Sequence, residues 1–123
     1  MAIPHFRIPL NLPHAATIAG RIAKLLDRRD YTPASDTAIE IAELLEPCLD
    51  EGENPPDPQA RELRDQAAEL ARRMVEEIQK HHLEGDRIGQ CVRNLFECLE
   101  LGEEGARLSL LAGENPSSLQ RPV

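Results

Sequence analysis

Apolar residues recur every three or four positions along four stretches of the chain, which is the spacing of amphipathic α-helices. The first stretch covers about 13–28, and Asn11 is placed to cap its amino end. Its apolar stripe consists of Ala15, Ile18, Ala19, Ile22, Leu25 and Leu26. The basic residues of this stretch lie opposite the stripe: Arg21, Lys24 and Arg28. We therefore expect one face of the first helix to be buried.

The second stretch begins at Thr32 and Pro33, a cap followed by a residue that suits the first turn of a helix. Pro47 lacks a backbone donor, so it should kink this helix or end it near 45–46. The expected buried face is Ala34, Ala38, Ile41, Ala42, Leu45 and Leu49. Opposite that face lies a set of carboxylates: Asp36, Glu40, Glu43, Glu46 and Asp50.

The third and longest helix is expected from the cap Asp57, after the loop 52–56, to about Leu83. Its apolar stripe is Leu63, Ala67, Leu70, Met74 and Ile78. Charges four residues apart predict ion pairs along its outer face: Arg61–Asp65, Glu69–Arg73, Arg72–Glu76 and Glu76–Lys80. Gly85 should stop this helix, and Asp86 should cap a fourth with a strongly apolar stripe.

Prolines and glycines predict less regular structure towards both ends of the sequence. Residues 1–12 should form an extended arm, 106–112 a short fifth helix, and 113–123 a mobile tail. The domain proper is then 13–112. Four amphipathic helices with short connections predict an all-α antiparallel bundle of four main helices with a short fifth helix.

Composition indicates a single domain in a reducing compartment. A chain of 123 residues is the usual size of one domain. The three cysteines are odd in number and form no C-x-x-C pair, which suits free thiols better than disulfides. No segment has the features of a signal peptide or the length of a membrane span. We expect a cytoplasmic protein.

No pattern of residues in the chain is typical of a catalytic or cofactor site. There is no Gly-x-Ser-x-Gly, and the glycines at 102 and 105 enclose two glutamates, the wrong charge for a phosphate loop. The adjacent His81 and His82 do not share a helix face, and no cysteines have metal-ligand spacing. We expect a protein with no cofactor, and we favour a function without catalytic activity.

The distribution of charge is the most informative feature. The span 36–57 holds eight acids and no Lys or Arg, so it accounts for the whole formal charge of −8. Such a surface repels nucleic acid and attracts a basic partner. We therefore interpret the chain as an interaction, regulatory or inhibitor protein. Its acidic helical face, Asp36, Glu40, Glu43, Glu46 and Asp50, would bind a basic macromolecular surface.

A second function is suggested by the spacing of carboxylates. Glu40-Ile-Ala-Glu43 is followed by Glu62-Leu-Arg-Asp65. This resembles the E-x-x-E and E-x-x-D signature of the MazG-like all-α nucleotide pyrophosphatases, over about residues 30–75. The resemblance implies that Glu40, Glu43, Glu62 and Asp65 would bind Mg²⁺ around a triphosphate. The alternative function is thus a magnesium-dependent nucleotide pyrophosphatase.

A third interpretation is a structural subunit of a helical homo-oligomer. The apolar arm 1–12 and the leucines of 108–111 are more hydrophobic than exposed ends require. Packing of these segments against a second copy would bury them. On this basis we expect a homodimer.

Overall fold

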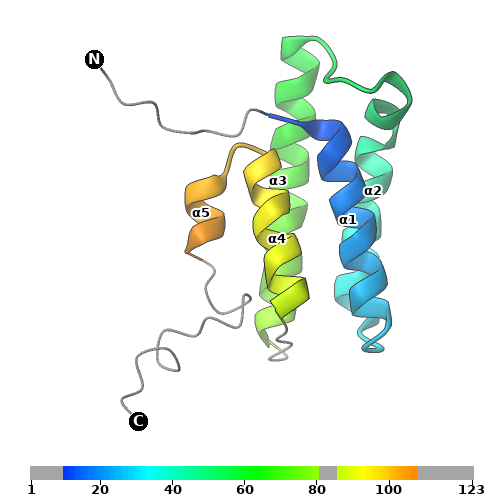
Figure 1. Cartoon of the computed structure of the whole chain (residues 1–123), viewed down its shortest axis with the longest axis vertical. Coiled ribbons are helices and arrows are strands. Elements are labelled where there is room, and N and C mark those ends of the chain that lie inside the picture. The colour runs from blue at the N-terminus through cyan, green and yellow to red at the C-terminus, as the bar shows by residue number, and fades with distance from the viewer. Residues whose placement is uncertain (1–9, 81–85, 108–123) are drawn as a thin grey trace.

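The computed structural model describes residues 10–80 and 86–107, and it is an antiparallel helical bundle (Figure 1). Its main helices are α1 (Leu12–Asp27), α2 (Thr32–Glu51), α3 (Asp57–Lys80) and α4 (Asp86–Cys98). A short α5 (Gly102–Ala106) follows and packs beside α4. The described residues contain no strand, so the expected all-α bundle is confirmed.

The hydrophobic core is formed by one face of each main helix. Its largest fully buried side chains include Ile22, Leu45, Met74 and Phe96, one from each of these helices. Within α3 the buried positions are mostly alanines, and Leu63 and Leu70 of the predicted stripe are only partly buried. Small side chains let the neighbouring helices approach this one closely. Among the described residues, no helix is both long and apolar enough to span a membrane.

The start of α1 is fixed by two asparagines. Asn11 caps the helix as predicted, because its side chain accepts a hydrogen bond from the backbone N–H of His14 at 3.0 Å. Asn54, in the loop between α2 and α3, accepts from Leu12 N–H at 2.8 Å and donates to the carbonyl of Leu10 at 2.7 Å. The backbone N–H of Asn11 also donates to the carbonyl of Cys98. The first turn of α1 is therefore held by both the α2–α3 loop and the end of α4.

Two predictions about α2 are wrong, and of the two alternatives for Pro47 the early end of the helix does not occur. The residue at its cap is Tyr31 rather than Thr32, with no side-chain capping bond. The helix continues through Pro47 to Glu51, so Pro47 does not end it near 45–46. The Pro47 residue is exposed, and the helix continues past it so that Cys48 is buried in the core. Leu49, expected in the buried face, is 46 % exposed.

Two further details differ from the sequence-based expectations. The fifth helix is seen at Gly102–Ala106, before the predicted 106–112; residues 108–112, like the arm 1–9 and the tail, lie outside the described part of the chain. The four ion pairs predicted within α3 are also absent from the ion pairs of the described residues. Instead Arg72 pairs with Glu104 of α5, and Arg64 with its neighbour Asp65.

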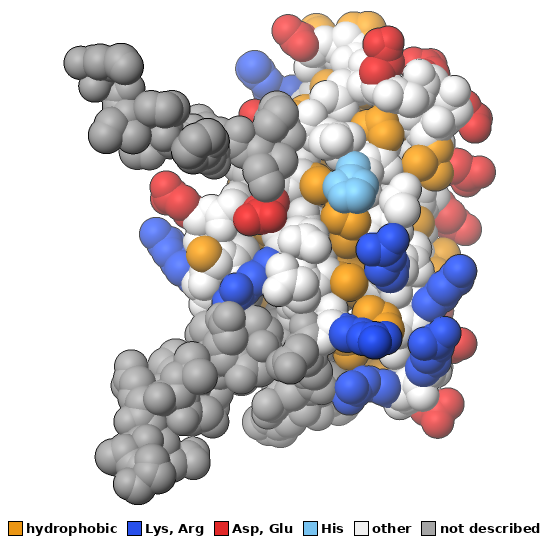
Figure 2. All heavy atoms as spheres, viewed as in Figure 1, with side chains coloured by type: hydrophobic (Ala, Val, Ile, Leu, Met, Phe, Trp, Pro, Cys, Tyr) orange, Lys and Arg blue, Asp and Glu red, His pale blue; other side chains and the backbone are white. Residues whose placement is uncertain are grey.

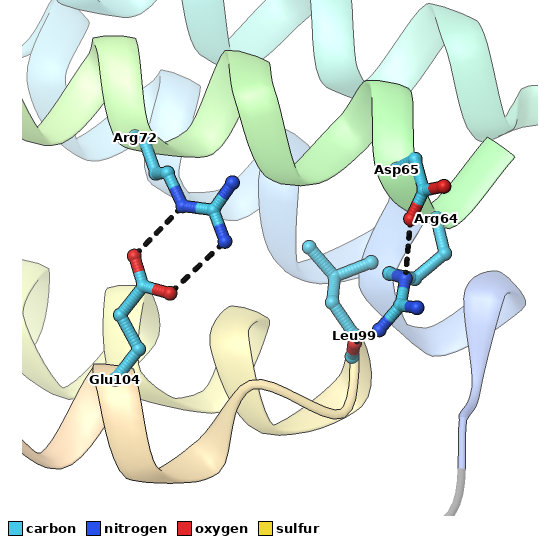
Figure 3. A network of polar contacts seen from close by, with 5 residues as sticks. All are labelled: Arg64, Asp65, Arg72, Leu99 and Glu104. Carbon is cyan, nitrogen blue, oxygen red and sulfur yellow. Dashed lines mark hydrogen bonds and ion pairs between the residues drawn. The ribbon is translucent and has the colours of Figure 1, made fainter. Parts of the chain in front are cut away.

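These arginines attach the α4–α5 segment to α3 (Figure 3). Arg72 Nε and Nη2 donate to the two carboxylate oxygens of Glu104 at 2.8 and 3.0 Å. Arg64 Nη1 donates to the carbonyl of Leu99, just after α4. An arginine fork that engages both oxygens of a carboxylate fixes orientation as well as distance. The short α5 thus depends on α3 for its position.

Candidate binding surface

All five carboxylates of the predicted partner-binding set project from α2 into solvent. Asp36, Glu40, Glu43, Glu46 and Asp50 are exposed, and none of them is in an ion pair of the described residues. Consecutive members are three or four residues apart and therefore share one helix face. We call these five residues the acidic surface. In Figure 2 the acidic side chains lie along the edge of the molecule formed by α2.

Apolar side chains lie within and beside the acidic surface. Ile39 is 41 % exposed, and it lies next to Asp36 and Glu43 on the helix surface, three residues after the first and four before the second. Leu49 flanks the same face. These two are the exposed large hydrophobic residues of the described chain. Sequence reasoning missed Ile39 as part of the surface, although its place outside the apolar stripe was readable from the helical period.

A shallow groove of about 580 Å³ runs between α1 and α2 along one side of the acidic surface. Glu43, Glu46 and Leu49 line it from α2, while Arg21 and Lys24 line it from α1. The lining is completed by Ala16, Thr17, Gly20 and Ala42. The acidic surface therefore borders a recess that has apolar parts and opposite charge on its far wall.

A second groove, of about 410 Å³, lies between α1 and α4 and is basic. Its charged lining consists of Arg21, Lys24, Arg28 and Arg87. The remainder includes the polar Gln90 and Asn94 and the less polar Leu25 and Cys91. Figure 2 shows Lys and Arg side chains gathered on the lower part of this face, next to the acidic edge. The sequence predicted the α1 cations but not their meeting with Arg87, because that depends on how α4 returns along α1.

The carboxylates of the alternative magnesium set are not brought together as a metal-binding group. Glu40 and Glu43 on α2, and Glu62 and Asp65 on α3, are all exposed. Asp65 accepts a hydrogen bond from Arg64 Nε at 2.9 Å. Within the described ranges, no three His, Cys, Asp or Glu residues are grouped so that they could hold a metal ion. The pair on α2 and the pair on α3 are both exposed to solvent and do not lie in the contact between these two helices.

The three cysteines are free thiols in this fold. Cys48 and Cys98 are buried, and Cys91 is half-buried at the basic groove. Burial raises the pKa of each thiol; at Cys91 the nearby Arg21 and Arg87 partly oppose that rise. A thiol with a raised pKa is a poor nucleophile at neutral pH. The raised pKa values therefore give no support to nucleophilic chemistry at these cysteines.

Comparison with known proteins adds no assignment. The chain matches no protein-family model, and neither the curated proteins nor the solved structures contain one that is significantly similar to it.

Proposed function

We propose that this protein is a non-enzymatic regulatory or inhibitor protein that binds a basic protein surface through the acidic surface of α2. The observation that carries the proposal is a row of five exposed carboxylates that form no ion pair with any described residue, with the exposed Ile39 among them. Charged side chains around an exposed apolar one have the composition of a binding site, with a polar rim and a hydrophobic centre. The carboxylates would attract the partner, and Ile39 would be buried by it.

The acidic surface does not stabilise α2. Neighbouring carboxylates three or four residues apart repel each other by about 0.2–0.5 kcal/mol per pair. Asp50 lies near the carboxyl end of α2, where the helix dipole disfavours negative charge, and no basic residue occupies the last turn. The side chains are exposed and contribute little to packing. Their arrangement therefore indicates a role outside the folding of this chain.

The α1–α2 groove supports the same interpretation. It lies next to Glu43 and Glu46, and its lining includes the exposed Leu49. A basic partner with one protruding apolar side chain would place that side chain in the groove and its cations on the carboxylates. Long-range attraction would then speed the encounter, and the apolar contacts would slow dissociation.

The test compares two charge reversals of equal size. One variant replaces Glu40, Glu43 and Asp50 by Lys; the other replaces three exposed α3 residues, Glu62, Glu69 and Glu76, by Lys. Proteins retained by the immobilised wild-type chain at low salt are identified, purified, and titrated against each variant. We expect the α2 variant to lose binding of a basic partner and the α3 variant to keep it.

Equal binding by the two variants would contradict the proposal, because it would show that only net charge matters. The circular dichroism spectra and melting temperatures should be near those of the wild type in both. The α2 variant should be slightly more stable, by up to about 1 kcal/mol, because Lys at these positions alternates with Asp36 and Glu46.

A further inference from the structure

The basic groove between α1 and α4 is unexpected in a chain with a formal charge of −8. Arg21, Lys24, Arg28 and Arg87 all line it, and none of them is in an ion pair of the described residues. Among the described residues, no carboxylate lines this groove. Arg21 and Lys24 also line the α1–α2 groove, opposite the carboxylates of that groove. Within the α1–α4 recess the four cations repel one another, and a bound anion would relieve that repulsion. We propose that the basic groove binds a small anion that carries two or more linked phosphate groups.

Helix stability does not explain the position of every cation. Lys24 and Arg28 lie at the carboxyl end of α1, where the helix dipole favours positive charge. Arg87 is different, because it lies in the first turn of α4, where the same dipole disfavours a cation. Arg21 is in the middle of α1 and gains nothing from either end. Arg21 and Arg87 are therefore the residues that point most clearly to a ligand.

The chemistry of the lining suits phosphate groups. Three of the four cations are arginines, whose planar guanidinium donates two parallel hydrogen bonds to phosphate oxygens. The side-chain amides of Gln90 and Asn94 add neutral donors on the α4 side. One phosphate group carries about two negative charges at neutral pH, so a single group balances only part of the four positive charges. Two or three linked groups match the groove better.

The size of the groove favours a small molecule over an acidic protein segment. Its volume of about 410 Å³ falls within the range of about 300–1,000 Å³ that is typical of small-molecule sites. Three of the cations follow one another along α1 and the fourth is on α4, so that an anion between the two helices can contact cations of both. Arg21 and Lys24 also line the α1–α2 groove, but the basic groove contains none of the five carboxylates of the acidic surface, and the proposal does not rest on the proposed function.

Calorimetric titration of the full chain with inorganic tripolyphosphate, in magnesium-free buffer of low ionic strength, tests the proposal. We expect saturable binding with one site. The double variant Arg21→Gln/Arg87→Gln should bind at least about tenfold more weakly, because it loses two charge-assisted contacts. A control removes the same charge from α3, through Arg61→Gln/Arg73→Gln, and should bind as the wild type does. The single variant Arg87→Gln serves if the double variant does not fold.

Cys91 gives a readout of where the anion binds. Cys48 and Cys98 are buried, so iodoacetamide should modify Cys91 first, and tripolyphosphate should slow that modification in the wild type. A nucleoside triphosphate that protects equally would show that the phosphates alone are recognised. Tighter binding of the nucleoside triphosphate than of tripolyphosphate would identify a nucleotide as the source of the phosphate groups. Its base would then lie near Leu25.

Two results would overturn the proposal. One is equal weakening of tripolyphosphate binding in the groove variant and the α3 control, which would show that the weakening depends only on the net charge of the protein. The other is protection of Cys91 by an oligoglutamate peptide but not by tripolyphosphate, which would make the groove a docking site for an acidic protein.

Discussion

Asn54 joins the loop between α2 and α3 to the start of α1 through both atoms of its side-chain amide. Its Oδ1 accepts from Leu12 N–H, and its Nδ2 donates to the carbonyl of Leu10. Only asparagine and glutamine offer a donor and an acceptor side by side, and asparagine does so on a short side chain. The sequence predicted the cap by Asn11 because that bond is local. It could not predict the bonds of Asn54, because their partners are more than 40 positions away in the sequence.

Replacing Asn54 by Ala should lower the free energy of unfolding by about 1–2 kcal/mol, because two hydrogen bonds are lost. Asn54→Asp should also destabilise the fold, since a carboxylate oxygen would then face the carbonyl of Leu10. The neighbouring exposed Glu53 provides a control through Glu53→Ala. Urea unfolding at pH 7 measures all three, and a wild-type midpoint for Asn54→Ala would show that the two bonds contribute nothing.

Gly105 marks a close approach of α5 to α4. A Cβ atom at this position would lie 2.9 Å from Phe96 Cβ, and Phe96 is fully buried and cannot move aside. Gly105→Ala should therefore destabilise the protein by about 1–3 kcal/mol. Gly102→Ala is the matched control, since its Cβ would meet only Glu97 Cγ at 3.7 Å. It should be neutral or slightly stabilising, because alanine favours helix over glycine.

Thermal unfolding of the two variants gives the comparison. A melting temperature for Gly105→Ala as high as that of Gly102→Ala would mean that α5 is not packed against Phe96. From the sequence, the glycines of this region indicated only less regular structure. The close contact with Phe96 explains the glycine at position 105, which helix propensity alone does not.

At the scale of elements, the main helices follow from the period of apolar residues, whereas α5 depends on a partner. The four long segments each bury a stripe large enough to fix their place. Helix α5 is only five residues long and is held by the pair between Arg72 and Glu104. The sequence instead predicted pairing of Arg72 with Glu76 four residues later. A bidentate contact with another element was not visible in a pattern restricted to one helix.

The Arg72–Glu104 pair should make stability depend on pH in a defined window. The hydrogen bond from Arg72 holds the pKa of Glu104 below its ordinary value. A carboxylate with a lowered folded pKa contributes stability above its unfolded pKa, and this is lost as the pH falls through the folded value. Glu104→Gln should cost about 0.2–1 kcal/mol at pH 7, since Arg72 and Glu104 are 51 % and 38 % exposed.

Below about pH 4 the stabilities of the wild type and Glu104→Gln should converge. Chemical denaturation at several pH values measures this difference. Glu76→Gln is the control, because Glu76 is exposed and is not in an ion pair of the described residues. A difference that stays constant from pH 7 to pH 3 would show that the Glu104 carboxylate is not the cause.

For the whole molecule, the main result is the separation of charge over the bundle. The sequence predicted the acidic surface, because its residues all belong to one helix, where the helical period shows that they share a face. It did not predict the basic groove, since α1 and α4 come together only through the topology of the bundle. The net charge of −8 therefore conceals two surfaces of opposite sign on adjacent faces.

The rate of association with the basic partner, measured by stopped flow over a range of ionic strength, tests the central claim most directly. For the wild-type chain the rate constant should fall about tenfold or more as salt rises, because screening shortens the reach of the acidic surface. The variant Glu40→Lys/Glu43→Lys/Asp50→Lys should associate slowly at every ionic strength. The α3 variant Glu62→Lys/Glu69→Lys/Glu76→Lys should follow the wild type. The same dependence on salt in the α2 variant and the wild type would contradict the account.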